Sequence, residues 1–326
     1  MIRTITRSML AAAMAAMGAA QADEALRHEA QALFGRIEAA TPTSPSAELG
    51  RALFWDARLS ADGKTSCASC HSAADWGADR RAQPVDARGK TMPRHAPTAF
   101  NALRQPALRW LADRKTGAEL AEGLLTGPMG FDSKDAAVKR LGELGYGAAF
   151  GGAFAGDPQP LSARNYGRAV EAYMATLATP APFDRFLAGD EGALSPRQKE
   201  GLRAFIASGC AGCHSGPLFG GASVQRFGVT REYWQATGSK RIDPGLFALT
   251  KDEADRYRFR VPMLRNVART APYFHDGATA RLDEAVRIMA DVQLGRTLDT
   301  AQVDSIVAFL ESLSGEIPPH FAPPVR

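Results

Sequence analysis

The pattern of apolar positions predicts helices in four parts of the chain. Apolar residues recur three or four positions apart in residues 45–60, 165–182, 195–209 and 299–315. The faces they form contain Leu49, Leu53, Phe54, Val170, Tyr173, Met174, Leu177, Val303, Ile306, Val307, Leu310 and Leu313. Strand-like alternation is scarce, and 31 Gly and 20 Pro residues interrupt the sequence between the helices. The pattern therefore predicts a mainly α fold with long irregular loops.

Two of these helices carry clear boundary signals. Ser195 is placed to cap a helix whose first residue is Pro196, and Gly209 is placed to stop it. Near the end of the chain, Asp299 and Gln302 have the spacing of a capping box. Both helices are therefore predicted with defined starts.

The helical stretch in residues 165–182 is broken by Pro180 and Pro182, and we place a domain boundary there. The predicted organisation is an N-terminal domain of residues 23–180 and a C-terminal domain of residues 181–326. A five-residue motif that occurs once in each half supports a distant internal repeat.

Residues 1–22 have the pattern of an export signal. Arg3 and Arg7 precede a short apolar run, and Ala20-Gln21-Ala22 matches an A-x-A cleavage site. Loss of the two arginines would lower the formal net charge from +4 to +2, too small an excess to suggest a nucleic-acid partner. No later stretch approaches the ~20 apolar residues of a transmembrane helix. We expect a soluble, exported, periplasmic protein that does not span a membrane.

All four cysteines belong to two C-x-x-C-H motifs. These are Cys67-Ala-Ser-Cys70-His71 and Cys210-Ala-Gly-Cys213-His214. In such motifs both thiols attach a haem covalently and the adjacent His becomes the proximal iron ligand. A thioredoxin-like pair or half of a zinc site is the alternative, but each cysteine pair has only its own His nearby. The motifs predict two covalently bound haem c groups, with His71 and His214 as iron ligands.

Four other histidines are present: His28, His95, His275 and His320. His28 lies near the mature N-terminus and His320 in a proline-rich tail, so both are expected to be exposed. The ligand on the second face of each iron must therefore come from His95, His275, a Met, a Tyr, or from no residue at all.

From about Leu49 to Leu313 the chain resembles the bacterial di-haem cytochrome c peroxidases and their MauG-type relatives. The segments that carry the resemblance are "ELGRALFWDARLSADGKTSCASCH", "PRHAPTAFN", "GCAGCHSGPLFGG" and "VPMLRNVARTAPYFHDGATARLDEAVRIMADVQLG". The resemblance implies two cytochrome c-like haem domains, the first reacting with hydrogen peroxide and the second storing electrons.

The resemblance also assigns residues around the two haems. Met289 matches the axial Met of the C-terminal haem, and a thioether there would raise its potential. Met289 also shares a helical face with Leu282 and Val286, which is typical of a core residue. Trp110 matches a Trp that lies between the haems and can relay an electron, although a lone Trp is more often simply buried.

Two departures from the family pattern concern the peroxide-binding face. Counting back from Pro93 places Ala87 where the peroxidases have a distal His, so we expect an open iron, as in the MauG relatives. His95 stands where the family has an Asn associated with an interdomain calcium ion. The carbonyls of Thr270 and Pro272 match the other calcium positions, so calcium is left open as a further cofactor. His275 is interpreted as a group near a haem propionate.

The family's acid–base Glu follows a Gly/Asn-Pro pair, but this chain has Pro128-Met129-Gly130 there. Cleaving the O–O bond requires a group that moves a proton between the two oxygens. Asp132, Glu122 and a water relay are the candidates, and Asp132 also suits a helix N-cap.

Three functions are consistent with the sequence. The first is a di-haem peroxidase that takes electrons from a small redox protein, a cytochrome c or a cupredoxin. The second is a MauG-like enzyme that uses peroxide to oxidise Trp or Tyr side chains of a partner protein. The third is a non-enzymatic electron carrier. The peroxidase relatives are commonly dimers, so a homodimer is one expected state.

Overall fold

The structure, a computed structural model, describes residues 18, 21–39 and 44–324 of the chain. The predicted mainly α fold is confirmed. Residues 21–33 are helical, and the helices that follow are Pro45–Trp55 (α2), Gly117–Leu124 (α3), Lys134–Glu143 (α4), Gly147–Ala153 (α5), Ala163–Met174 (α6), Pro182–Leu187 (α7), Pro196–Ala207 (α8), Tyr233–Thr237 (α9), Phe247–Thr250 (α10), Leu282–Leu294 (α11) and Thr300–Glu311 (α12). In the described part of the chain, Val224–Arg226 (β1) and Arg258–Arg260 (β2) pair antiparallel.

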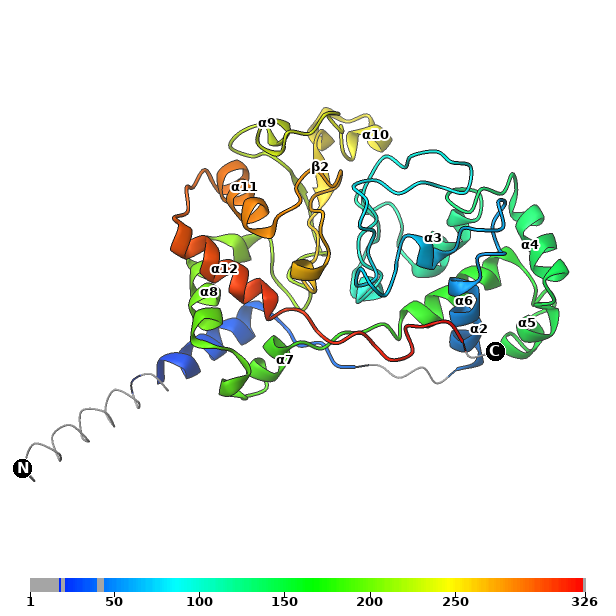
Figure 1. Cartoon of the computed structure of the whole chain (residues 1–326), viewed down its shortest axis with the longest axis horizontal. Helices are drawn as coiled ribbons and strands as arrows, with labels where there is room; N and C mark the ends of the chain where they lie inside the picture. The colour runs from blue at the N-terminus through cyan, green and yellow to red at the C-terminus, as the bar shows by residue number, and fades with distance from the viewer. Residues whose placement is uncertain (1–17, 19–20, 40–43, 325–326) are drawn as a thin grey trace, which may run out of the picture.

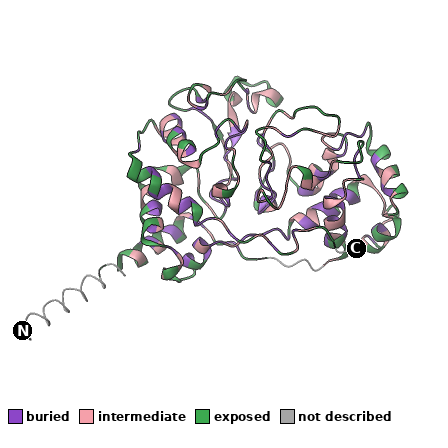
Figure 2. Ribbon diagram, viewed as in Figure 1, coloured by how far each residue is buried: buried purple, intermediate pink, exposed green. Residues whose placement is uncertain are grey.

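The helices form two groups, one from each half of the chain (Figure 1). In the first group α6 packs against α2 and α3, and in the second group α12 packs against α8 and α11. Long loops fill the space between the groups. The outlying helix α4 is mostly exposed (Figure 2).

The predicted boundary signals are confirmed. The Ser195 hydroxyl accepts the Gln198 N–H at the start of α8, and the Asp299 carboxylate accepts the Gln302 N–H at the start of α12, each within a capping box. Gly209, which follows α8, has a φ of 91°, a conformation that glycine adopts without strain. It turns the chain directly into the second Cys-His motif.

A glycine allows the main helix pair of each half to pack closely. A Cβ atom on Gly50 of α2 would lie 1.9 Å from the Ala169 carbonyl oxygen of α6. A Cβ atom on Gly201 of α8 would lie 1.8 Å from the Ser305 carbonyl oxygen of α12. The same small-residue contact therefore recurs in both halves, as an internal repeat predicts.

Replacing Gly201 with Ala should destabilise the protein strongly. The new methyl group has no room against the α12 backbone, so we expect a loss of about 3 kcal/mol, the upper part of the usual overpacking range. Gly151→Ala in α5 is the matched control, because no atom lies within 4 Å of its Cβ position. Chemical denaturation of the holoprotein should show a large loss only for Gly201→Ala. Equal shifts in the two variants would contradict this view of the helix crossing.

The two ends of the chain cross over to the opposite halves (Figure 1). Leu26 and Phe34 belong to the hydrophobic core built by α7, α8 and α12. In the other direction, Phe321 is buried in a cluster with Phe54 and Phe100 of the N-terminal half. The boundary at residues 180 and 181 stays a prediction, and each half completes its core with a segment from the far end of the chain.

The expectations for the termini have mixed outcomes. Residues 1–17, 19 and 20, which hold most of the predicted export signal, lie outside the described residues. His28 is exposed, as expected. His320 is not, because it is half buried and its Nε2 lies 2.9 Å from the Thr176 hydroxyl. No helix in the described ranges has the length and apolar character needed to cross a bilayer.

Candidate active site

Both Cys-His motifs face one continuous, largely apolar cavity between the two helix groups. Its lining includes Cys67, Cys70 and His71 from the first motif and Cys210 and His214 from the second. The structure thus brings together two segments that lie far apart in the sequence. A shared apolar cavity of this kind suits two flat hydrophobic macrocycles held near each other.

His71 lines this cavity, and one of its ring nitrogens is held by the backbone. Its backbone N–H donates to the Cys67 carbonyl at 3.0 Å, just after the short 3-10 helix Cys67–Ser69. Its Nδ1 lies 2.8 Å from the Gly77 carbonyl oxygen. A carbonyl can only accept, so Nδ1 carries the proton and Nε2 keeps its lone pair for a metal. Burial lowers the pKa of His71, which favours this neutral form.

His214 repeats this arrangement in the second half. Its N–H donates to the Cys210 carbonyl at 3.0 Å, and its Nδ1 lies 2.9 Å from the Phe219 carbonyl oxygen. Burial lowers the pKa of His214 as well. The two carbonyls, from Gly77 and Phe219, orient the rings. Sequence reasoning missed them, because a backbone acceptor leaves no residue-type signal.

The cysteines also fit covalent haem attachment. All four are free thiols, so no disulfide competes for them. Burial raises the pKa of Cys67 and of Cys210 to about 11, which means that both surroundings favour an uncharged sulfur. A thioether is uncharged, and the residues present therefore fit a haem at each motif.

Met289 lies on α11 and faces the cavity that His214 also lines. It is half buried, and its neighbours Leu282 and Val286 line the same cavity. Met289 is therefore at the wall of the cavity instead of deep inside the protein core. Its role as an iron ligand stays a prediction.

Ala87 packs beside the cavity and is not among the residues that line it. Its N–H donates to the Pro128 carbonyl at 2.9 Å. The nearby lining consists of Val85, Met92, Pro128 and Met129. This part of the wall is apolar, and the open iron face stays a prediction. Sequence reasoning did not single out the two methionines, whose thioethers are soft potential ligands.

Trp110 lies in the wall of the cavity and joins the two halves. It is 9% exposed, and its indole N–H donates to the His95 carbonyl at 2.9 Å. Its own carbonyl accepts the Arg260 N–H at 2.7 Å. These bonds hold Trp110 in the cavity wall, and its relay role stays a prediction.

His95 and His275 meet next to Trp110. The His95 N–H donates to the His275 carbonyl at 2.7 Å, and His95 Nδ1 lies 3.1 Å from the Arg81 carbonyl oxygen. The Nε2 atoms of both histidines are buried and have no hydrogen-bond partner. His95 lines the cavity, whereas His275 stacks on Phe259 with ring centroids 4.2 Å apart. The proximity of His275 to a haem propionate stays a prediction.

Comparison with known proteins shows the family. The family model described as "Di-haem cytochrome c peroxidase" matches residues 44–192. The chain is 42% identical to the cytochrome c551 peroxidase of Pseudomonas aeruginosa over 92% of this chain and 89% of that protein. The chain belongs to the di-haem cytochrome c peroxidase family. It is also 37% identical to the cytochrome c551 peroxidase of Nitrosomonas europaea, over 97% of this chain and 93% of that one.

MauG proteins match the chain at lower identity than these two peroxidases. The chain is 33% identical to MauG of Methylorubrum extorquens over 75% of this chain and 68% of that protein. Among solved structures, a MauG-like protein associated with microbial copper homeostasis matches with a TM-score of 0.76 and 25% identity, over 90% of this chain and 99% of that one. The helical di-haem architecture is thus common to both branches.

Neither carboxylate considered for the family's acid–base role lies in the cavity wall. The Asp132 side chain is fully exposed and pairs with Arg88 at 3.0 Å. Glu122 pairs with Lys134 at 2.6 Å and is also outside the lining. The expected N-cap at Asp132 is wrong by one residue, because the Ser133 hydroxyl caps α4.

The family's calcium ion does not fit the residues present here. Calcium takes oxygen ligands, and at this position the chain has the imidazole of His95. The His95 carbonyl oxygen accepts the Trp110 indole N–H, and His95 Nδ1 lies 3.1 Å from the Arg81 carbonyl oxygen. Within the described ranges, no three His, Cys, Asp or Glu side chains are grouped to hold a metal ion. We therefore assign no calcium ion to this site.

Proposed function

We propose that this protein reduces hydrogen peroxide to water in the periplasm, with electrons from a small redox protein, a cytochrome c or a cupredoxin. The observation that carries the proposal is the single cavity lined by both Cys-His motifs, in a chain 42% identical to a cytochrome c551 peroxidase. One peroxide molecule takes up two electrons and two protons and gives two water molecules.

The two halves of the chain have different roles in this proposal. The bound haems supply the one-electron redox changes. His71 holds the peroxide-reactive site, while His214 and Met289 hold the electron-storing site. The cavity wall near Val85 and Met129 is apolar. The described lining contains one carboxylate, Asp113, which pairs with Arg109 at 2.9 Å, and neither Glu122 nor Asp132 belongs to it. We therefore assign proton transfer near Ala87 to ordered water.

Trp110 is proposed to carry electrons between the sites. In Trp110→Phe, transfer from the second haem to the first should slow by about tenfold, equivalent to about 1.4 kcal/mol in the barrier. Trp55→Phe is the matched control, because Trp55 packs against Phe321 outside the cavity lining. Stopped-flow spectroscopy of the half-reduced protein after peroxide mixing measures the rate. A rate equal to that of the unmodified protein would remove Trp110 from the pathway.

Steady-state turnover tests the main proposal. The purified di-haem protein should consume peroxide with reduced cytochrome c or cupredoxin as donor. As isolated, it should show a high-spin ferric signal from an iron with one open face. Absence of turnover with both donor classes would refute the peroxidase assignment.

A MauG-like activity is the second candidate. The absence of Glu122 and Asp132 from the described cavity lining favours it, and the resemblance of Met289 to the axial Met of the peroxidases counts against it. This activity predicts a peroxide-dependent mass shift on Trp or Tyr of a co-expressed partner protein. Peroxide turnover without any such shift assigns the protein to the peroxidase branch.

A further inference from the structure

Two asparagines occupy equivalent places in the two halves. Asn101 and Asn266 have φ values of 58° and 63°, and each begins a short 3-10 helix, Ala102–Arg104 and Val267–Arg269. The left-handed conformation is one that Asn tolerates better than most residues. Both side chains are buried. They mark corresponding points of the internal repeat.

In the first half, Asn101 clamps the segment that follows α6. Its N–H donates to the Leu177 carbonyl at 2.9 Å, and its Oδ1 accepts the Thr179 N–H at 3.0 Å. One asparagine thereby satisfies two backbone groups, two residues apart, at the end of the domain.

In the second half, Asn266 clamps the segment that follows α12 in the same way. Its N–H donates to the Leu313 carbonyl at 3.1 Å, and its Oδ1 accepts the Gly315 N–H at 3.1 Å. Gly315 is thus the counterpart of Thr179. The two clamps have the same hydrogen-bond pattern.

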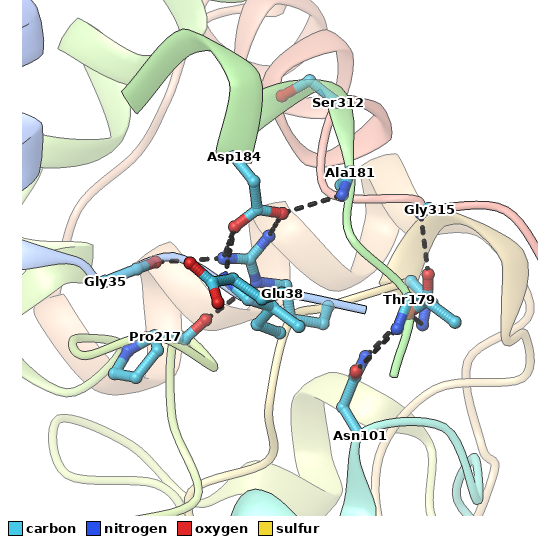
Figure 3. Close-up of polar contacts among 12 residues, drawn as sticks. Gly35, Glu38, Asn101, Thr179, Ala181, Asp184, Pro217, Ser312 and Gly315 are labelled. Atoms are coloured by element: carbon cyan, nitrogen blue, oxygen red, sulfur yellow. Dashed lines mark hydrogen bonds and ion pairs between the residues drawn. The ribbon is translucent and has the colours of Figure 1, made fainter. Parts of the chain in front are cut away.

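The two clamps differ at the counterpart residues Thr179 and Gly315 (Figure 3). The Thr179 hydroxyl accepts the Asn101 Nδ2–H at 2.7 Å and the Asn266 Nδ2–H at 2.9 Å, so its oxygen joins both halves. A Cβ atom on Gly315 would lie 2.4 Å from the Thr179 carbonyl oxygen. There is room for only one side chain where the repeats meet, and that side chain is Thr179.

The acceptor capacity of the Thr179 hydroxyl is fully used in this position. It offers two lone pairs, and each receives one amide donor. Thr179 and Asn266 are 0% exposed, so no solvent can replace a lost bond. Removing the oxygen would leave two buried N–H groups, one in each half, without an acceptor. The halves would then relieve this strain by shifting relative to each other.

We propose that Thr179 is a positioning residue that fixes the two haem-binding halves in one relative placement and so sets the electron path between them. The link to electron transfer rests on the proposed function. Other contacts keep the halves together without Thr179, since Arg94 pairs with Asp243 at 2.7 Å and Arg260 donates to the Arg109 carbonyl at 2.8 Å. Loss of the hydroxyl should therefore alter the placement of the halves without separating them.

The experiment compares Thr179→Val, which keeps the shape but loses the hydroxyl, with Thr179→Ser, which keeps the hydroxyl. Spin labels at Lys139→Cys in α4 and Glu200→Cys in α8 report the distance between the halves of the holoprotein, and both sites are exposed. Pulsed EPR should show a broadened or shifted distribution for Thr179→Val and an unmodified one for Thr179→Ser. An unchanged distribution in Thr179→Val overturns the proposal, whatever its thermal stability.

Two further measurements separate the possible failures. Inter-haem electron transfer should slow by about tenfold in Thr179→Val while both haem spectra stay the same, equivalent to about 1.4 kcal/mol in the barrier. If the unmodified protein shows no inter-haem transfer, the proposed function fails and the label distances alone decide the role of Thr179. If Thr179→Val does not fold, Asn101→Gly removes one donor to the Thr179 hydroxyl together with the acceptor of the Thr179 N–H, and it keeps the left-handed turn. An unchanged distribution in that variant then overturns the proposal.

Discussion

Peroxide turnover should fall by at least about 100-fold when His71 is replaced by Gly. Losing a residue that only orients a metal ligand typically lowers activity about 10–100-fold, and losing the ligand itself should cost more. The His71 ring lines the cavity, and its Nδ1 lies 2.8 Å from the Gly77 carbonyl oxygen, which leaves Nε2 as the nitrogen that can bind iron. The measurement is steady-state peroxide consumption with a saturating donor.

His214→Gly is the matched control for this prediction. Both variants should retain covalent haem, since the cysteines are untouched. Optical and EPR spectra should show that His71→Gly changes the haem of the first motif only, and His214→Gly that of the second only. If His214→Gly alone removed peroxide binding, the assignment of the reactive site to the first half would be reversed.

Replacing Met289 with Leu should lower the reduction potential of the second haem. Axial ligands tune haem potentials over a range of about 0.8 V, and we expect a fall on the order of 0.1 V when a thioether is lost. The reason is that a thioether stabilises ferrous iron. Spectroelectrochemical titration measures the shift, and the half-reduced state needed for turnover should become harder to reach.

Met263→Leu provides the control for Met289→Leu. Met263 also lines the cavity, so its replacement tests whether packing alone affects the potential. We expect a change well below that of Met289→Leu. A larger shift in Met263→Leu would identify it, and not Met289, as the ligand.

The fold was predictable where its causes are local. Ser195 and Asp299 cap helices because their acceptors satisfy amides only three residues away, and such spacing is visible in the sequence. The position of His320 was not predictable. Its burial depends on Thr176, a residue far away in the sequence, and a proline-rich tail carries no signal for that contact.

In the candidate site, too, the features with a local sequence signal were predictable and those made by distant residues were not. The Cys-His motifs identify the attachment points, because five adjacent residues carry all of that chemistry. The apolar wall formed by Met92 and Met129 and the bridge formed by Thr179 come from loops brought together in three dimensions. In the sequence, Thr179 looks like any linker threonine. Only the structure shows that Asn101 and Asn266 both donate to its hydroxyl.

The crossing of the chain ends has a consequence for how the molecule is assembled. Phe321 completes the buried cluster of Phe54 and Phe100, and Cys67 packs against the same cluster. A cut between the halves would therefore leave the first Cys-His motif without an aromatic neighbour that only the C-terminal half supplies. The packing of the first site depends in this way on a segment of the other half.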